Sequence, residues 1–418
     1  MTPNSPAATA SGIRRRDLFA AASALPLLAS AAPPVQPRRL VVVVCSGGWD
    51  TAYSIDPKLG QVGFDTPTRV NQDDPLDVEQ VETFSGIPVA FNVGRRPSVS
   101  GFFERWGSRT CVANGVWVGG VSHMTNIRKI LTGTTVEGRP DFGTIASSVI
   151  APDHAIGHVD LVGISLPGEL PSRLVRVGHN GQLRTLLGND LAFAPPGFRP
   201  DDVQSLAVSD FRSSRLERLR ALRGGSEAAD ATLDTLADAA MRRPGLEAMA
   251  ESLDYALAFG AGPESFDFQL ELVADLFRRD LCRVVTMAST VSWDSHVGNN
   301  AAQSDNLEEL FDGLTRLCTD FEEAGILETT TIAVVSEMTR TPLLNATSGK
   351  DHWPGASAIL VGCGVGGGRV VGSTNGAAEP EPLDGAIQEY SNLVAGILSV
   401  MGVDSESWLP GIAPMELG

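Results

Sequence analysis

Two predicted strands with titratable residues between them occupy Thr329–Gly362, TTTIAVVSEMTRTPLLNATSGKDHWPGASAILVG. The apolar, β-branched run Thr331–Ser336 predicts a buried strand, and Ala356–Gly362 predicts a second one. The segment between these strands carries titratable residues, among them Glu337, Arg340, Asp351 and His352. Open α/β sheets present their functional side chains beyond the carboxyl ends of the strands, so we expect a functional site here.

The rest of the chain alternates between apolar strands and amphipathic helices. Apolar runs predict five further strands: Leu40–Cys45, Thr110–Val118, His158–Ile164, Leu174–Val177 and Arg283–Ala288. Helices are predicted at Phe102–Trp106, Met124–Thr132, Phe266–Asp280, Ser304–Ala324 and Gly385–Met401. Residues 55–98, rich in Pro, Gly and Asp, indicate a surface excursion. Such alternation is typical of an α/β fold with a mostly parallel central sheet and helices on both faces.

The first 32 residues have the pattern of a signal peptide. Arg14–Arg16 precede an apolar run that is too short to span a bilayer and that ends in the small residues Ala29–Ala31. The paired arginines predict export by the twin-arginine machinery, with a disordered basic tail as the alternative. We therefore expect a bacterial protein of the periplasm or the extracellular space. The mature chain would be one domain over 38–418, with a helical excursion around 209–256 and no membrane span.

Composition limits the possible partners. The chain has 418 residues, a hydrophobic content of 43% and a net charge of −18, which describe a soluble globular protein with an acidic surface. Such a surface repels polyanions, so we exclude nucleic acid as a partner. The five cysteines are odd in number and lack CxxC spacing, so we expect buried free thiols, with one long-range disulfide left open.

Titratable residues follow the strands at several places. The set is Asp50, Ser122-His123, Asp294 with His296, Glu337, and Asp351-His352. Asp50 ends a glycine-rich turn and Ser122 precedes a predicted helix, so capping is the alternative for both. At such a corner a serine can also be exposed as a nucleophile. His154, His158 and His179 have no such neighbours, and we interpret them as surface or core residues.

This residue set is typical of a metal site. Carboxylates and imidazoles with few cysteines favour zinc or manganese over magnesium. The alternation Asp294-x-His296 places both side chains on the same side of an extended segment. We therefore predict one or two divalent ions held by members of the set Asp50, Asp294, His296, Glu337, Asp351 and His352, with calcium and magnesium left open.

The order of these segments resembles a known family. The segments are GGWD at 47–50, SH at 122–123 with TG at 132–133, WDSH at 293–296, EMTRTP at 337–342 and KDHWP at 350–354. They resemble the twin-arginine-exported family of unknown function numbered 1501, within the alkaline phosphatase and sulfatase superfamily. The resemblance implies one alkaline-phosphatase-like, three-layer α/β domain.

The resemblance also implies roles for particular residues. It implies that Asp50 binds metal, as does the pair Asp294 and His296, and that His352, with Asp351, supplies the late ligands. Glu337 stands where an Asp-His pair would bridge to a second metal, but no histidine adjoins it. A nucleophile would start the helix that ends at Thr132-Gly133. Ser122 is the hydroxyl there, while the usual spacing points to His123.

Two functions follow as expectations. The first is an exported metal-dependent hydrolase of small anionic phosphate or sulfate esters, in which metal polarises the ester and activates water or Ser122. Arg340, or less favoured Arg128 or Lys350, would neutralise the substrate's charge, while an ion pair with Glu337 is the alternative for Arg340. The second is a non-catalytic envelope protein that binds a metal or a ligand on the same fold.

Overall fold

The structure is a computed structural model. It describes residues 38–66, 73–154, 156–176, 202–223, 265–289 and 292–418, with a few positions between 225 and 237. The predicted signal peptide, His179 and most of the predicted excursion beyond Arg223 lie outside the described residues. The start of that excursion is helix α5, Asp202–Arg223.

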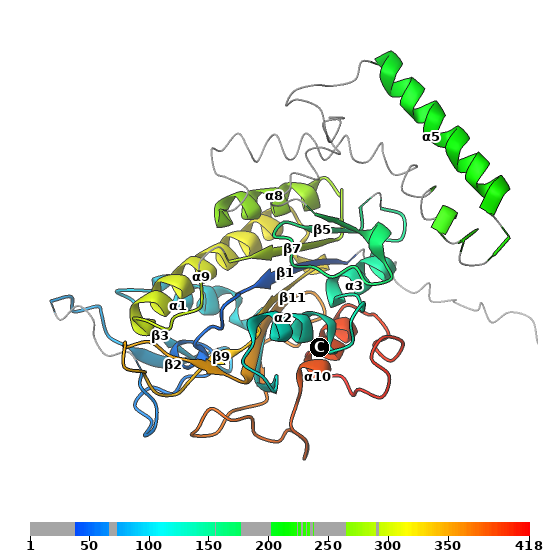
Figure 1. Cartoon of the computed structure of the whole chain (residues 1–418). Helices are drawn as coiled ribbons and strands as arrows, with labels where there is room; N and C mark the ends of the chain where they lie inside the picture. The colour runs from blue at the N-terminus through cyan, green and yellow to red at the C-terminus, as the bar shows by residue number, and fades with distance from the viewer. Residues whose placement is uncertain are drawn as a thin grey trace, which may run out of the picture. The chain divides into compact units, whose positions relative to one another are not determined.

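An eight-stranded sheet organises the described part of the chain, in the order β12-β4-β11-β8-β1-β7-β5-β6 (Figure 1). Its strands are β1 Arg39–Val44, β4 Thr110–Trp117, β5 His158–Asp160, β6 Leu174–Arg176, β7 Val284–Ala288, β8 Thr330–Val335, β11 Gly355–Gly362 and β12 Arg369–Val371. All neighbours pair in parallel except β11, which is antiparallel to both β4 and β8. The predicted mostly parallel sheet is confirmed.

The central strand β1 is buried on both faces. It pairs with β7 on one side and β8 on the other, so that Val42 lies between Thr286 and Ala333. Its side chains alternate between two apolar clusters, with Val41 and Val43 in one and Leu40, Val42 and Val44 in the other. A strand covered on both faces needs this continuous apolar run.

Helices cover both faces of the sheet (Figure 1). The cluster that contains Val41 includes side chains of α1 Pro97–Trp106, α8 Phe266–Arg278 and α9 Asn299–Glu323. The cluster that contains Val42 includes side chains of α2 His123–Thr132, α3 Phe142–Ile150 and α10 Tyr390–Val400. The expected three-layer α/β arrangement is therefore present.

Smaller elements complete the described structure. The stretch expected to be a surface excursion contains a hairpin, β2 Gln80–Phe84 and β3 Ile87–Phe91, whose turn residues Ser85 and Gly86 both have positive φ, as a type I′ turn requires. A two-stranded pair, β9 Thr339–Arg340 and β10 His352–Trp353, sets Arg340 opposite His352. Short 3-10 turns lie at η1 Thr51–Tyr53, η2 Gly107–Arg109, η3 Pro171–Arg173 and η4 Leu327–Thr329.

Two expectations about the whole chain concern membranes and disulfides. Within the described residues, the structure contains no helix with the length and apolar character needed to cross a bilayer. All five cysteines are free thiols, and four of them are buried. The prediction of buried free thiols is confirmed for these four, while Cys363 is partly exposed.

Candidate metal centre

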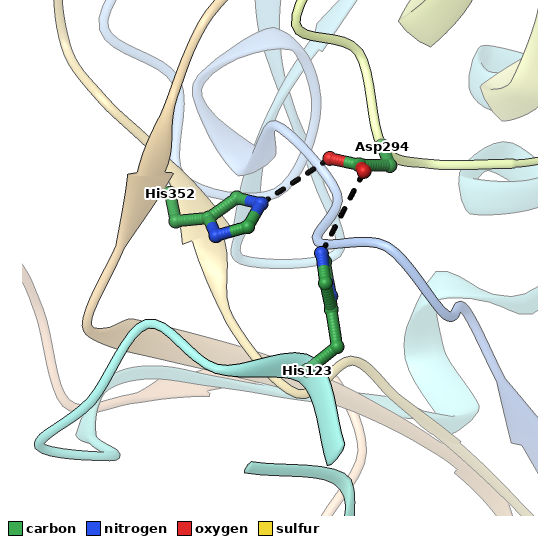
Figure 2. Close-up of side chains that lie close together, drawn as sticks. All are labelled: His123, Asp294 and His352. Carbon is green, nitrogen blue, oxygen red and sulfur yellow. Dashed lines mark hydrogen bonds and ion pairs between the residues drawn. The ribbon is translucent and has the colours of Figure 1, made fainter. Parts of the chain in front are cut away.

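The polar residues that follow the strands meet at one place. His123 begins α2 after β4, Asp294 lies in the loop between β7 and α9, and His352 lies in β10. Figure 2 shows their side chains directed toward one another, with the Asp294 carboxylate between the two rings. One potential ligand atom from each of these residues lies within 4.8 Å of the other two. We call these three residues the ligand triad.

Distances in the ligand triad are short, and His296 extends it. Asp294 Oδ1 lies 3.3 Å from His352 Nε2, and Asp294 Oδ2 lies 3.7 Å from His123 Nε2. His296 Nε2 lies 3.1 Å from Asp294 Oδ1 and 3.0 Å from His352 Nε2. Asp294 and His296 therefore face the same site, as their alternation predicts.

Each histidine is held by its other ring nitrogen, Nδ1. The partners are Glu337 Oε1 for His123 at 2.6 Å, Asp351 Oδ1 for His296 at 2.9 Å and the Val121 carbonyl for His352 at 2.8 Å. A carbonyl or an ionised carboxylate only accepts, so a neutral ring that carries its proton on Nδ1 satisfies each of these three contacts. All three Nε2 atoms then direct a lone pair into the site. Anchoring of this kind is typical of metal-binding histidines.

The donor set fits a divalent metal. The buried Nε2 of His123 has no hydrogen-bond partner among the described residues. Two unprotonated Nε2 atoms 3.0 Å apart, as in His296 and His352, repel each other unless a cation lies between them. In a tetrahedral zinc site with bonds of about 2.0–2.1 Å, ligand atoms are separated by about 3.3 Å. The nitrogen and oxygen donors and their spacing are therefore compatible with a divalent metal ion.

Glu337 lies behind His123 and outside the ligand triad. Its side chain is fully buried, and Oε1 accepts hydrogen bonds from both Gly47 N, at 2.8 Å, and His123. The hydrogen bond with Glu337 raises the pKa of His123 above its ordinary value, against the opposing effect of burial. Glu337 therefore orients the His123 ring, so that its Nε2 atom faces the triad.

Arg340 holds Asp294 in place. Its buried guanidinium donates to the carbonyl oxygens of Gly48, Trp293 and Lys350 and, at 2.7 Å, to Asp294 Oδ1. Burial by itself would raise the pKa of Asp294, but the hydrogen bond from Arg340 and the proximity of His352 outweigh burial and lower that pKa. The ion pair of Arg340 is thus with Asp294, where the sequence left Glu337 as the alternative.

The structure places Asp50 away from the ligand triad. Its Oδ1 accepts a hydrogen bond from Ala52 N at 3.3 Å and so caps η1, the alternative that the sequence left open. Its Oδ2 accepts from Asn299 Nδ2 at 2.9 Å and lies 2.8 Å from Lys350 Nζ. The carboxylate is buried, and these three groups occupy both of its oxygens.

Ser122 stands at the start of α2 with an exposed side chain. It occupies the N-cap position, but its hydroxyl makes no capping hydrogen bond. Ser122 therefore has the position of a capping residue but does not make the capping hydrogen bond. Ser122 directly precedes His123 in the chain, and its side chain is exposed.

The remaining described histidines lie elsewhere. His158 is fully buried, between the hydroxyl groups of Thr144 at 3.1 Å and Thr286 at 2.8 Å. Burial lowers its pKa to about 3, so it is a neutral core residue, one of the two interpretations left open. His154 Nε2 lies 3.6 Å from Asp280.

Two amide side chains beside the site, those of Asn299 and Gln303, belong to no motif identified in the sequence. Asn299 and Gln303 are one helical turn apart at the start of α9, and both point toward the loop that carries Asp294. Gln303 accepts a hydrogen bond from Asp50 N at 2.8 Å and donates to Trp293 O and Ser295 Oγ, each at 2.9 Å. Their i, i+4 spacing was the only sign in the sequence that they share a face.

Comparisons with known proteins give one family. The model of the family described as "Protein of unknown function (DUF1501)" matches residues 198–413, just over half of the chain. No curated protein matches the sequence.

Three solved structures illustrate the similarity at the level of structure. A protein in the alkaline phosphatase superfamily from Vibrio parahaemolyticus has 8% identity and a TM-score of 0.35, covering 90% of this chain and 69% of its own. The lipoteichoic acid synthase LtaP from Listeria monocytogenes has 8% identity and a TM-score of 0.39, and the match covers 91% of this chain and 74% of that one. A phosphonate monoester hydrolase of Agrobacterium radiobacter has 11% identity and a TM-score of 0.36, and the match covers 91% of this chain and 79% of that one. With TM-scores below 0.5, these similarities contribute nothing to the functional proposal.

Proposed function

The chain belongs to the DUF1501 family, as its sequence predicts, and from its site we propose that it is a metal-dependent hydrolase of phosphate or sulfate esters. The observation that carries the proposal is the convergence of three histidine Nε2 atoms on the Asp294 carboxylate, each ring being anchored through Nδ1. Groups of this kind with anchored rings form metal centres.

The ligand triad would hold the ion, with His296 beside it. The chemistry that a divalent ion held there would supply is polarisation of an ester and a lower pKa for a bound water. Glu337 keeps the Nδ1 proton on His123, and Arg340 fixes the direction of the Asp294 carboxylate. These two residues position ligands; they do not contact the substrate.

Ser122 is the proposed nucleophile. Its exposed hydroxyl lies at the N-terminus of a ten-residue helix and beside His123. The helix dipole favours negative charge at this end, which lowers the cost of an oxyanion there. A water molecule is the alternative nucleophile, and the Ser122→Ala variant separates the two.

We further propose export by the twin-arginine pathway to the periplasm or beyond. The proposal rests on Arg14–Arg16 and the short apolar run that follows them. Expression of the full chain with Arg14–Arg16 replaced by lysine should keep the protein in the cytoplasm, and unchanged export would contradict this part of the proposal.

A second candidate is a non-catalytic metal- or ligand-binding envelope protein. One observation favours it: the cationic residues considered for substrate contact are already paired. Arg340 contacts Asp294, Lys350 contacts Asp50, and Arg128 contacts Glu137 at 3.0 Å. A phosphate or sulfate ester would therefore depend on the metal for charge neutralisation.

The test is turnover by the purified full chain loaded with Zn²⁺ or Mn²⁺. A panel of phosphate monoesters, phosphate diesters and sulfate esters is assayed with wild type, Ser122→Ala, His352→Ala and the control His154→Ala. We expect turnover of at least one class that His352→Ala abolishes and His154→Ala preserves. One bound ion per chain without turnover would support the second candidate, and no bound ion would contradict the hydrolase and the metal-binding version of the second candidate.

A further inference from the structure

We propose that the ammonium group of Lys350 is a built-in cation that takes the place of a second metal ion. The centre then binds one divalent ion, and Asp50 is an ion-pair partner of Lys350 and not a metal ligand. This inference rests on the metal centre of the proposed function, and it fixes the number of ions and the role of Asp50.

The Lys350 side chain is enclosed. It is fully buried, and Nζ lies 2.8 Å from Asp50 Oδ2 and 4.9 Å from the centre of the Tyr53 ring. The contact with Asp50 is a close ion pair that lies off the direction of an ideal hydrogen bond. A buried ammonium needs an opposite charge, and a cation over an aromatic face gains further stabilisation.

Both carboxylate oxygens of Asp50 already have partners within the protein. Oδ1 accepts from Ala52 N, while Oδ2 is shared between Asn299 Nδ2 and Lys350 Nζ. The side chain is 2% exposed, so a ligand role would require these contacts to break inside the protein. Breaking a buried ion pair leaves an uncompensated charge, which is strongly unfavourable.

The loop that carries Asp294 and His296 separates the ion pair from the ligand triad. Between these two residues, Ser295 directs its side chain to the other side, where Oγ contacts Asn299 Oδ1 at 2.5 Å. Asn299 in turn donates to Asp50. The Ser295 carbonyl accepts from Lys350 N at 3.0 Å. The extended loop thus presents ligands on one side and contacts the Asp50–Lys350 pair on the other.

Charge leads to the same conclusion. A divalent ion at Asp50 would stand within a few ångströms of a buried ammonium, and like charges repel strongly where water is excluded. Lys350 therefore neutralises the charge of Asp50, as a second ion would otherwise do, and this neutralisation does not depend on the metal concentration.

The test measures metal binding and thermal unfolding, independently of turnover. Wild type, Asp50→Asn, the double variant Asp50→Asn with Lys350→Met, and two controls are titrated with Zn²⁺ against a competing chelator. Bound metal is counted by mass spectrometry of the desalted protein. The controls are Asp56→Asn, which breaks a nearby ion pair with Lys58, and His352→Ala, which removes a proposed ligand.

We expect one ion per chain in wild type and in Asp50→Asn, with affinities that agree within about threefold. Changes behind a ligand cost about 10–100-fold, and loss of a ligand costs at least as much, so this agreement excludes a ligand role. Asp50→Asn should lower the melting temperature, and the double variant should recover part of that loss. The double variant also supplies the binding result should Asp50→Asn alone not fold.

Three outcomes would overturn the inference. They are two ions per wild-type chain, a loss of affinity above about tenfold in both Asp50 variants, or no bound ion at all. The last outcome also removes the metal centre itself. One bound ion with no ester turnover would leave this inference standing and contradict only the hydrolase proposal.

Discussion

His123 and Glu337, 214 positions apart in the sequence, are joined by a contact of 2.6 Å between Nδ1 and Oε1. Glu337 is fully buried and is also held by Gly47 N at 2.8 Å, so its position does not depend on the imidazole. The carboxylate therefore determines which nitrogen of His123 faces the ligand triad. Several expected outcomes depend on this contact and its equivalents.

Replacing Glu337 by glutamine should weaken metal binding and move its pH dependence. We expect a loss of about 10–100-fold in affinity, because the partner that orients His123 is weakened. Since Glu337 raises the pKa of His123, its removal should lower that pKa and shift the midpoint of metal binding to lower pH. Chelator competition between pH 5 and pH 8 measures both. Glu328→Gln, at an exposed pair with Arg109, is the control, and an unmoved midpoint would contradict the assignment.

Metal should stabilise the folded protein through the ligand triad. With free metal at 100 times the dissociation constant, the free energy of unfolding should rise by about 2.7 kcal/mol. His352→Ala should remove this increment, whereas His154→Ala, outside the site, should keep it. Thermal unfolding with added Zn²⁺ and with chelator measures the effect. An equal increment in wild type and His352→Ala would show that the ion binds elsewhere.

Gly47 should not tolerate a side chain. Its φ is +120°, and an added Cβ would lie 2.4 Å from Asp294 N. We expect Gly47→Ala to cost roughly 1–3 kcal/mol or more in the free energy of unfolding and to displace Asp294. Gly60→Ala is the control, because its φ is +70° but nothing lies within 4 Å of its added Cβ. If urea unfolding gives the same loss of unfolding free energy for both variants, the cost comes from the backbone conformation alone, and the predicted clash with Asp294 is contradicted.

Buried His158 should make the fold sensitive to acid. Its pKa is about 3 in the folded protein and about 6.5 when unfolded, so it contributes stability above pH 6.5 that is lost as the pH falls toward 3. The difference in unfolding free energy between wild type and His158→Gln should shrink by about 2 kcal/mol from pH 7.5 to pH 5. Buried Asp141, whose pKa burial raises to about 7, acts in the opposite direction and is common to both proteins. A constant difference would contradict the neutral state of His158.

The sheet could be predicted because its central strands are continuous apolar runs. β1 and β8 begin one residue before the predicted starts, and β7 begins one residue after. Helix α3 was not predicted, because FGTIASSVI contains glycine, serine and β-branched residues that form helices poorly. Its N-cap, Asp141, accepts from Thr144 N at 2.7 Å and was the available sign. Likewise, the turn Ser85-Gly86 is less typical of hairpins than Asn-Gly.

At the site, the sequence indicated which residues lie close together but not which of them are ligands and which hold the ligands in place. Asp294 and His296 share a face because alternation in an extended segment requires it. Whether Glu337 is a ligand or the partner of a ligand depends on the ring orientation of His123, which only tertiary packing determines. In the same way, the pairing of Asp50 with Lys350 joins residues 300 positions apart, and no local pattern reports it.

The most direct test is the anomalous diffraction of crystals of the full chain grown with Zn²⁺ and measured at the zinc edge. We expect one peak about 2.0–2.2 Å from His123 Nε2, His352 Nε2 and a carboxylate oxygen of Asp294, and no peak at Asp50. The absence of a peak among these three side chains in crystals that bind zinc elsewhere, or a peak ligated by Asp50, would contradict the proposed metal centre.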